Sequence, residues 1–240
     1  MRIPCAAKEH GETHIASDSP KRLIVAIDGP AGAGKSTIAR SLAERLGIAY
    51  VDTGAMYRAI ALWALEANID LDDPFRLEQL AKQARIEFTP DNRVLLNSED
   101  VTAKIREPRV TDAASKVAAV PGVRKAMREE QRRIGANQSV VMEGRDIGTV
   151  VFPEARVKIF LDAAPEARAG RRAKESGEPE HEIARDMLER DARDRTRAEA
   201  PLAQAPDAEY LDSTALTPIE VEEKILRIVR EKTSNGKAAT

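Results

Sequence analysis

The stretch that decides the fold of this 240-residue chain reads Gly29-Pro30-Ala31-Gly32-Ala33-Gly34-Lys35-Ser36-Thr37. It meets the pattern G-x-x-x-x-G-K-[ST], in which glycines let backbone N–H groups turn inward around phosphate oxygens. The apolar run Leu23–Ile27 before it predicts a short buried strand, and Ile38, Leu42 and Leu46 after it recur at the four-residue spacing of an amphipathic helix. Strand, glycine loop and helix therefore follow in the order that a phosphate-binding loop requires.

This loop predicts the donor side of a phosphoryl-transfer site. We expect all nine residues from Gly29 to Thr37 to contact ATP, with Lys35 at the β- and γ-phosphates and the Ser36 hydroxyl on Mg²⁺. The motif alone leaves kinase, GTPase and motor ATPase open. No asparagine is followed by lysine, so the guanine-reading Asn-Lys-x-Asp motif is missing, and the run that ends at Asp162 lacks the Asp-Glu pair of many motor ATPases. These features favour a small-molecule kinase.

Alternating strand and helix patterns predict an α/β fold with a parallel core sheet. Four further apolar runs complete a set of five candidate strands: Ile48–Val51, Ser139–Met142, Val157–Leu161 and Tyr210–Asp212. Helical patterns are expected after the turn 52–54, from 113 to 134 and from 218 to 231. Between the second and third strands, Arg85–Thr89 and Arg93–Leu96 predict a hairpin. We therefore predict the three-layer fold of P-loop NTPases with a small inserted subdomain.

Composition excludes several classes of function. The chain has 38 basic and 40 acidic residues and a formal charge of −2, which argues against charge-driven nucleic-acid binding. The single cysteine, Cys5, forms no intrachain disulfide and no paired-cysteine zinc site. We expect a cytoplasmic protein without a membrane segment, in which residues 1–21 are a flexible polar extension and residues 233–240 a tail.

Arginines outside the loop indicate an anionic acceptor. Arg58, near the start of the helix after the 52–54 turn, could clamp a phosphate bidentately, although an exposed helix arginine is an equal alternative. The run Glu143-Gly144-Arg145-Asp146 follows a buried strand, at the edge where open α/β sheets bind ligands. Burying these charges requires partners or a ligand, so a structural ion pair is the alternative at this position.

A charged stretch, Gly170 to Arg197, predicts a mobile segment near the loop. Arg190, Asp194 and Arg197 stand at i, i+4 and i+7 and share one face if the stretch is helical. A solvated helix with salt bridges explains the same pattern. Beside a phosphate-binding loop, however, such a segment can close over the γ-phosphate and exclude water.

Taken together, these motifs closely resemble those of the bacterial cytidylate kinases, a family of nucleoside monophosphate kinases. Five blocks within residues 22–232 carry the resemblance: IDGPAGAGKST from Ile27, DTGAMYR from Asp52, AASKVAAVPGVR from Ala113, EGRDIGTVVFPEA from Glu143 and RDARDRTRAEAPL from Arg190. The resemblance implies transfer of a phosphoryl group from ATP to CMP or dCMP. It also implies a monophosphate-binding insert at about 69–135 and a helical lid at about 170–197.

The same resemblance implies roles for individual residues. Ser115, Arg124 and Asp146 would read the cytosine ring, because an aspartate accepting from the exocyclic amine and an arginine donating to the ring acceptors disfavour uracil. The remaining substrate-binding positions are Thr53, Glu143, the acceptor-phosphate ligands Arg58 and Arg145, and the pentose-side residues Arg190 and Asp194. The catalytic set is Lys35, Arg145, Arg190 and Arg197, the last of them at the transferring phosphoryl group.

Two other functions remain open at the level of the sequence. The first is a P-loop kinase for a different acceptor, such as UMP or a small metabolite. The second is a regulatory module that binds ATP as a switch and transfers nothing, which the acceptor-side arginines argue against. For the kinase we expect a monomer whose partners are CMP, dCMP and ATP, with neither nucleic acid nor membrane among them.

Overall fold

The computed structural model describes residues 22–234, apart from the side chains of residues 175 and 176. The predicted extension, 1–21, and residues 235–240 of the predicted tail lie outside the described residues. Thr233 and Ser234 are the last residues of helix α8 (Pro218–Ser234), which continues three residues beyond its predicted end at Glu231.

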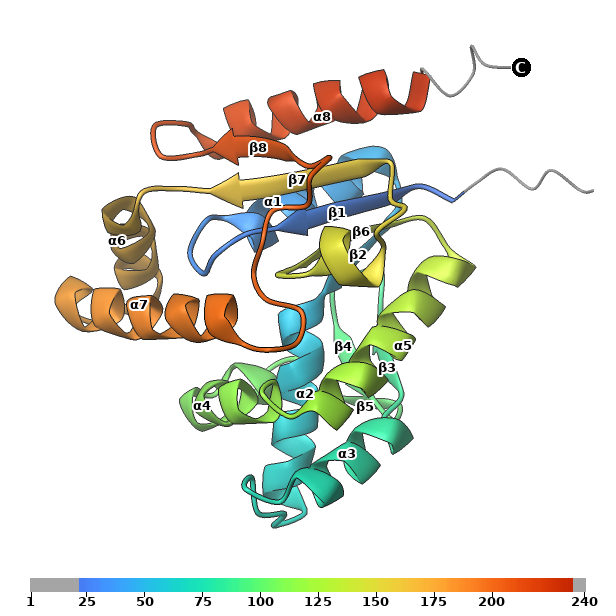
Figure 1. The fold of residues 1–240 in the computed structure, drawn as a ribbon, viewed down its shortest axis with the longest axis vertical. Helices are drawn as coiled ribbons and strands as arrows, with labels where there is room; N and C mark the ends of the chain where they lie inside the picture. The colour runs from blue at the N-terminus through green and yellow to red at the C-terminus, as the bar shows by residue number, and fades with distance from the viewer. Residues whose placement is uncertain (1–21, 235–240) are drawn as a thin grey trace, which may run out of the picture.

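A five-stranded parallel sheet forms the centre of the molecule (Figure 1). Its strands are β1 (Ile24–Asp28), β2 (Ala49–Asp52), β6 (Val140–Gly144), β7 (Val157–Asp162) and β8 (Glu209–Asp212). These are the five predicted strands, and the predicted parallel core is confirmed. The order β2-β6-β1-β7-β8 puts β1 in the middle, so the glycine loop begins between the ends of β6 and β7.

Helices cover both faces of this sheet and make three layers. On one face, α1 (Lys35–Leu46) and α8 bury Ile38 and Ile225 against Val25 and Ile27 of β1. On the other face, Ala26 packs among residues of α2 (Thr53–Glu66) and α5 (Pro121–Asn137). Successive side chains of a strand point to opposite faces. A strand buried on both faces therefore reads as a continuous apolar run, as β1 does.

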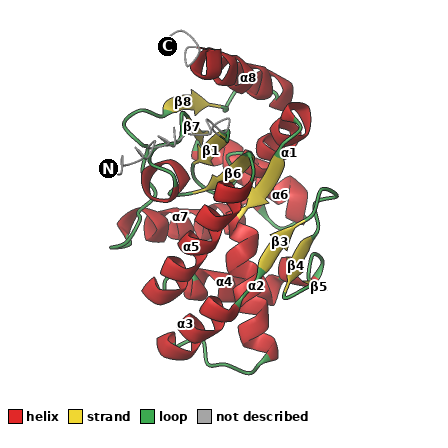
Figure 2. Ribbon diagram, turned by 90° about the vertical axis from the view of Figure 1, so that its right-hand side faces the viewer, coloured by secondary structure: helices red, strands yellow, loops and turns green. Residues whose placement is uncertain are grey.

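The chain between α2 and β6 forms a second group of elements, in the lower half of Figure 1. It contains α3 (Pro74–Gln83), the strands β3 (Ile86–Phe88), β4 (Val94–Leu96) and β5 (Glu99–Asp100), a 3-10 helix η1 (Lys104–Arg106) and α4 (Pro108–Val117). Figure 2 shows the three antiparallel strands as a group apart from the core sheet. The predicted hairpin is β3–β4, and β5 is too short to show a period in the sequence.

Two local differences from the predicted helices have simple causes. The helical pattern expected from Ala113 to Ile134 is two helices, because Pro121 fits the first turn of α5 but not a helix interior. Helix α2 starts at Thr53, within the predicted turn, because the Asp52 side chain accepts a hydrogen bond from the Ala55 N–H and caps the helix.

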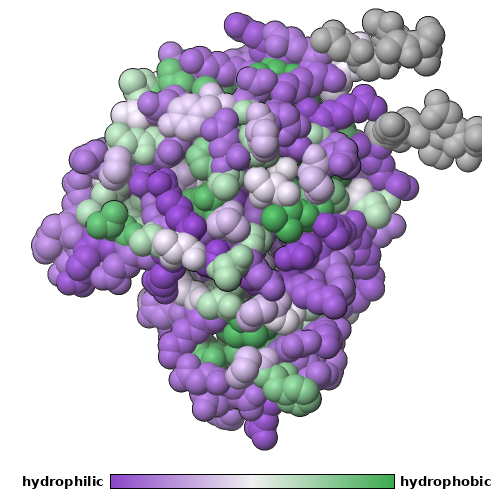
Figure 3. Space-filling view, viewed as in Figure 1, coloured by the Kyte–Doolittle hydropathy of each residue, from purple (hydrophilic) through white to green (hydrophobic). Residues whose placement is uncertain are grey.

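Three elements complete the fold around the carboxyl ends of the strands. A short π-helix, η2 (Ile147–Val151), follows β6, and α6 (Pro165–Ser176) and α7 (Glu180–Thr196) follow β7 as a helical hairpin. Gly177, with φ 76°, ends α6. No helix within residues 22–234 has the length and hydropathy that a bilayer crossing needs. On the face seen in Figure 3, hydrophilic residues predominate and hydrophobic ones form small separate patches.

Candidate active site

The glycine loop joins the end of β1 to the start of α1 by a path that requires glycine. At Gly29, φ is 149° and a Cβ atom would lie 1.9 Å from the carbonyl oxygen of Leu161 on β7. Gly34, with φ 92°, is the residue that precedes the first turn of α1. The backbone N–H groups at this helix start have no partner within the helix, so the loop presents free donors beside the positive end of the helix dipole.

Lys35 lies inside this loop as a buried cation. Its Nζ donates a hydrogen bond to the Pro30 carbonyl oxygen at 2.6 Å. Burial and the nearby positive charge of Arg145 lower the pKa of the Lys35 ammonium well below its usual range, against an opposing effect of Glu143. The neighbouring Ser36 is exposed, and its hydroxyl lies near enough to the Glu143 carboxylate to lower the pKa of that group. An anion in the loop would relieve the electrostatic cost of Lys35.

Arg124 and Asp146 form a buried ion pair beside the loop. Arg124 Nη2 donates to Asp146 Oδ2 at 2.7 Å, and the two side chains are 4% and 12% exposed. The guanidinium also stacks over the Tyr57 ring at 5.7 Å, and its Nε has no hydrogen-bond partner. The pair presents a donor and an acceptor side by side, which is the arrangement that recognises the edge of a heterocyclic base.

The predicted face of α7 meets the residues that follow β6. Arg145 Nε donates to Asp194 Oδ2 at 2.9 Å. Arg197 lies 3.4 Å from Asp194 Oδ1 and 3.6 Å from Asp146 Oδ1. Burial opposes ionisation of Asp194, but Arg145 and Arg197 outweigh it and hold the pKa of this carboxyl below its usual range. The structure thus brings together two motif blocks that are about fifty residues apart.

Arg190 is the third predicted residue of this α7 face. Among the described side chains it forms neither an ion pair nor a hydrogen bond, although the charge of Asp194 acts on it. Burial lowers the pKa of its guanidinium to about 10, and repulsion from Arg145 adds to this effect. A convergence of cations in a site shielded from water favours an anionic ligand.

Arg58, the other predicted acceptor-phosphate ligand, lies in the second turn of α2 and pairs with Asp52. Its Nη2 donates to Asp52 Oδ2 at 2.7 Å, while its buried Nε has no partner. Thr53 donates its hydroxyl proton to the Glu143 carbonyl oxygen at 2.7 Å, and Glu143 accepts from the Tyr50 hydroxyl at 2.6 Å. Burial and the charge of Asp52 raise the pKa of the Glu143 carboxyl. Arg58 therefore keeps N–H donors for a ligand beyond its bond to Asp52, and Glu143 links β2 to the start of α2.

The structure does not draw Ser115 into this network. Ser115 lies half-buried on α4, which packs against α2, and it forms no hydrogen bond with any described residue.

Three buried charged residues at or next to the loop were not singled out in the sequence. Arg168 of α6 and Asp191 of α7 form a buried ion pair at 2.6 Å. Both bond to Ala31 of the loop: Arg168 Nη1 donates to its carbonyl at 2.9 Å and Asp191 Oδ1 accepts from its N–H at 3.3 Å. The third residue, Asp28, is the buried last residue of β1. In the sequence, these three residues are marked only by a charge close to a motif, and many exposed residues have the same feature.

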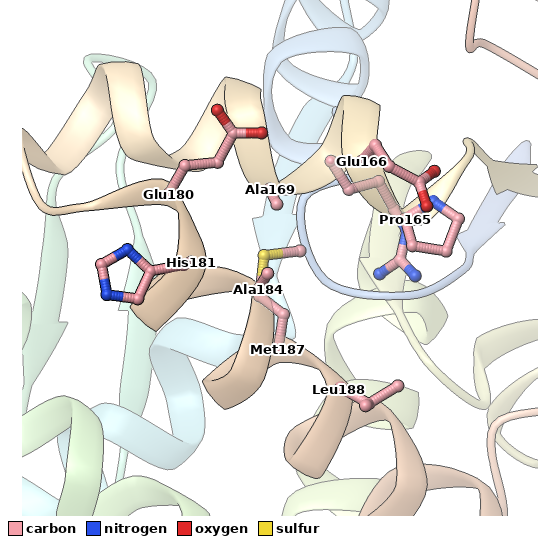
Figure 4. Close-up of a pocket in the computed structure, with 9 residues that line it drawn as sticks. Pro165, Glu166, Ala169, Glu180, His181, Ala184, Met187 and Leu188 are labelled. Atoms are coloured by element: carbon pink, nitrogen blue, oxygen red, sulfur yellow. The ribbon is translucent and has the colours of Figure 1, made fainter.

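A groove of about 550 Å³ runs between α6 and α7 (Figure 4). Most of its lining is apolar, including Ala169, Ala184 and Met187, and Arg168 also lines it. Met187 packs against Gly32 of the loop, where an added Cβ would lie 2.7 Å from its methyl carbon. The groove is therefore next to the phosphate-binding loop.

Comparisons with known proteins agree with this geometry. The family model described as cytidylate kinase matches residues 25–231. The chain is 60% identical over 230 residues to the cytidylate kinase of Solibacter usitatus, with 93% of this chain and 99% of that protein covered. It is 47% identical to the cytidylate kinase of Pelotomaculum thermopropionicum, with 89% of this chain and 96% of that protein covered.

A solved structure supports the fold on its own. An uncharacterized protein from Eubacterium ventriosum aligns with a TM-score of 0.53 at 13% identity, covering 88% of this chain and 99% of that chain. The family resemblance predicted from the five motif blocks is confirmed by the sequence comparisons. The chain, an α/β protein with a P-loop, belongs to the cytidylate kinase family of nucleoside monophosphate phosphotransferases.

Proposed function

We propose that this protein transfers the γ-phosphoryl group of MgATP to CMP or dCMP and releases ADP with CDP or dCDP. The observation that carries this proposal is the buried Arg124–Asp146 ion pair, 2.7 Å long, next to a loop built for a triphosphate. Cytosine presents an exocyclic amine beside ring-nitrogen and carbonyl acceptors. Asp146 accepts from the amine and Arg124 donates to the acceptors, whereas uracil presents a carbonyl and a ring N–H at the matching positions.

On the donor side, the residues from Gly29 to Thr37 hold the triphosphate. Their N–H groups surround its oxygens, and Lys35 neutralises the β- and γ-phosphates. Mg²⁺ in kinase sites is held by one or two protein oxygens together with the substrate phosphates. The exposed Ser36 hydroxyl, which lies near the Glu143 carboxylate, fits that role, and the bound ion would neutralise charge on the transferring group.

On the acceptor side, four arginines converge on an anion from different elements. Arg58 of α2 and Arg145 after β6 bind the acceptor phosphate, and Arg190 and Arg197 at the α7 face neutralise the transferring phosphoryl group. Asp194, between Arg145 and Arg197, accepts from the hydroxyl groups of the pentose. Ser115 of α4 contacts the base, Thr53 and Glu143 complete the acceptor pocket, and the insert, about 69–135, forms its outer wall.

The chemistry follows from positioning and charge. A monophosphate is largely ionised near neutral pH, so its attacking oxygen needs no general base. The arginines hold that oxygen in line with the γ-phosphorus and stabilise the negative charge that spreads over the transferring group. Closure of the lid, about 170–197, excludes water and so suppresses hydrolysis of ATP. The protein acts as a cytoplasmic monomer on small-molecule substrates.

An acceptor panel tests this proposal. ADP release from ATP is measured with CMP, dCMP, UMP, AMP and dTMP, at saturating ATP and Mg²⁺. We expect CMP and dCMP to give the highest kcat/KM, and the Lys35→Met variant to remove the signal and so rule out a contaminating kinase. ADP release that does not depend on an acceptor, or that prefers UMP or AMP, would contradict the proposal.

A further inference from the structure

Two parts of the motif blocks have no role in the proposed reaction: Asp28 of IDGP and Ile147-Gly148 of EGRDIG. In the folded chain they meet. The Ile147 N–H donates to Asp28 Oδ1 at 2.8 Å, and the Gly148 N–H donates to Asp28 Oδ2 at 2.7 Å. Asp28 is 5% exposed and stands opposite Gly144 in the β1–β6 register. A single carboxylate therefore receives two consecutive N–H groups from a segment about 120 residues away.

The segment that Asp28 holds is the π-helix η2. Its first N–H groups have no partner inside the helix, and the Asp28 carboxylate caps them from a different strand. At the other end, Arg132 of α5 donates to the carbonyl oxygens of Val150 and Val151 at 2.8 and 3.0 Å. Side chains from outside therefore hold both ends of η2. Isolated π-turns are rare and occur often at functional sites.

The backbone of Asp146 belongs to the same turn. The Asp146 carbonyl oxygen accepts from the N–H groups of Val150 and Val151 at 2.9 and 3.1 Å. The position of η2 therefore sets the position of Asp146 and, one residue earlier, of Arg145. Asp28 also directly precedes Gly29, the first residue of the glycine loop. Its carboxylate is thus a short rigid link between the loop and the turn that carries the acceptor-side residues.

We propose that Asp28 is a positioning residue for base selection, which aligns Asp146 and Arg145 with the glycine loop without touching either substrate. This inference rests on the proposed function, in which Asp146 reads the cytosine amine. Because the hydrogen bonds run to backbone N–H groups, a shift at Asp28 moves both residues of the turn together. A misplacement of about 1 Å is enough to lower turnover substantially.

The Asp28 carboxylate is kept at this buried position at an electrostatic cost. Burial raises the pKa of the Asp28 carboxyl to about 6, even though the two N–H groups and Lys35 favour ionisation, and the charge of Asp146 raises it further. If the side chain at position 28 served only to fill space, we would expect an apolar residue at this buried position. Gly148 leaves the room that the carboxylate occupies, since a Cβ on it would lie 3.3 Å from Asp28 Oδ2 and 3.2 Å from the Lys158 side chain.

The test is the Asp28→Asn variant, which keeps the shape of the side chain but turns one acceptor oxygen into a donor. The readout is the ratio of kcat/KM for CMP to kcat/KM for UMP. We expect this ratio to fall about 10-fold or more through a higher KM for CMP, by analogy with residues that orient metal ligands. The KM for ATP should change less than about twofold, because the loop residues that hold ATP keep their contacts.

Asp191→Asn is the matched control. Like Asp28, Asp191 is buried and accepts a hydrogen bond from a backbone N–H, but its donor is Ala31 of the glycine loop and not a residue of η2. The CMP to UMP ratio of this variant should therefore stay at the parent value. If Asp28→Asn does not fold, the same ratio is measured in Arg132→Met. Arg132 is exposed, so its replacement should be tolerated, and it holds the other end of η2. A parent-like ratio in the deciding variant overturns the inference. Absence of CMP-dependent ADP release by the parent protein would instead overturn the proposed function.

Discussion

Asp146→Asn is the substitution that most directly tests how the base is read. The change removes a carboxylate that accepts from the cytosine amine and supplies an amide that can donate to the uracil carbonyl. A hydrogen bond to a charged group contributes about 1.5–3 kcal/mol. At about 1.4 kcal/mol per tenfold change, kcat/KM for CMP should fall roughly 10- to 150-fold. The kcat/KM for UMP should stay the same or rise, because the new amide can donate to the uracil carbonyl, so the CMP to UMP ratio falls by at least the same factor.

The same change also weakens the fold by an amount that the structure bounds. Removing one partner of a buried ion pair costs about 3–5 kcal/mol. The amide that replaces the carboxylate would still accept one hydrogen bond from Arg124, and the Tyr57 ring still covers the guanidinium, so we expect the lower end, about 3 kcal/mol. For a chain of this size that loss lowers the melting temperature by roughly 6–12 °C.

The assay measures ADP release with CMP and with UMP, well below the melting temperature of the variant. Asp191→Asn is the control, because the Arg168–Asp191 pair is 2.6 Å long with both side chains 8% exposed. We expect it to lose a similar amount of stability and to keep the parent selectivity. A CMP to UMP ratio within about twofold of the parent in Asp146→Asn would refute the assignment of Asp146 to the base, since the lost charge-assisted bond predicts at least tenfold.

Three further predictions concern the phosphates. Arg145→Ala should lower kcat/KM for CMP about 10²- to 10³-fold, the range for removing a group that stabilises transition-state charge. Its thermal melt should change little, because Asp194 keeps Arg197 as a partner, and near-parent turnover with CMP would contradict the assignment. Burial and Arg145 lower the pKa of Lys35 from about 10.5 to about 7, so between these two pH values the unfolded chain binds a proton that the folded chain lacks. Stability should therefore rise with pH across that window. Binding of ATP should restore the positive charge of Lys35 by raising its pKa. Titration calorimetry near pH 8, in two buffers of different ionisation enthalpy, should therefore record proton uptake on ATP binding by the parent protein and none by Lys35→Met. Ser36→Ala should raise the Mg²⁺ concentration needed for half-maximal ADP release while leaving the melt unchanged, and an unaltered Mg²⁺ dependence would exclude Ser36 as a ligand.

The features that could be predicted from the sequence are those governed by neighbouring residues. An apolar run, a glycine pattern and a four-residue period each depend on a few consecutive positions. They therefore predicted β1 within one residue at each end and the last turn of α1 at Leu46. Two helix boundaries were less accurate, since a proline or a capping aspartate decides them. Ser115 was predicted by resemblance alone, and its contact with the base stays a prediction.

The sequence by itself determined the kind of chemistry, because the loop that binds a triphosphate and the arginines that bind an acceptor are local patterns. Tertiary structure alone decided which charges meet. Arg124 pairs with Asp146 across 22 positions and Arg145 with Asp194 across 49. Asp28, which bonds to Gly148 across 120 positions, shows no local signal beyond a charge at the end of a strand. These partners depend on the strand order β2-β6-β1-β7-β8, since the sheet brings the ends of distant strands to one edge. A buried charge must find its partner in space, and its position along the chain does not specify that partner.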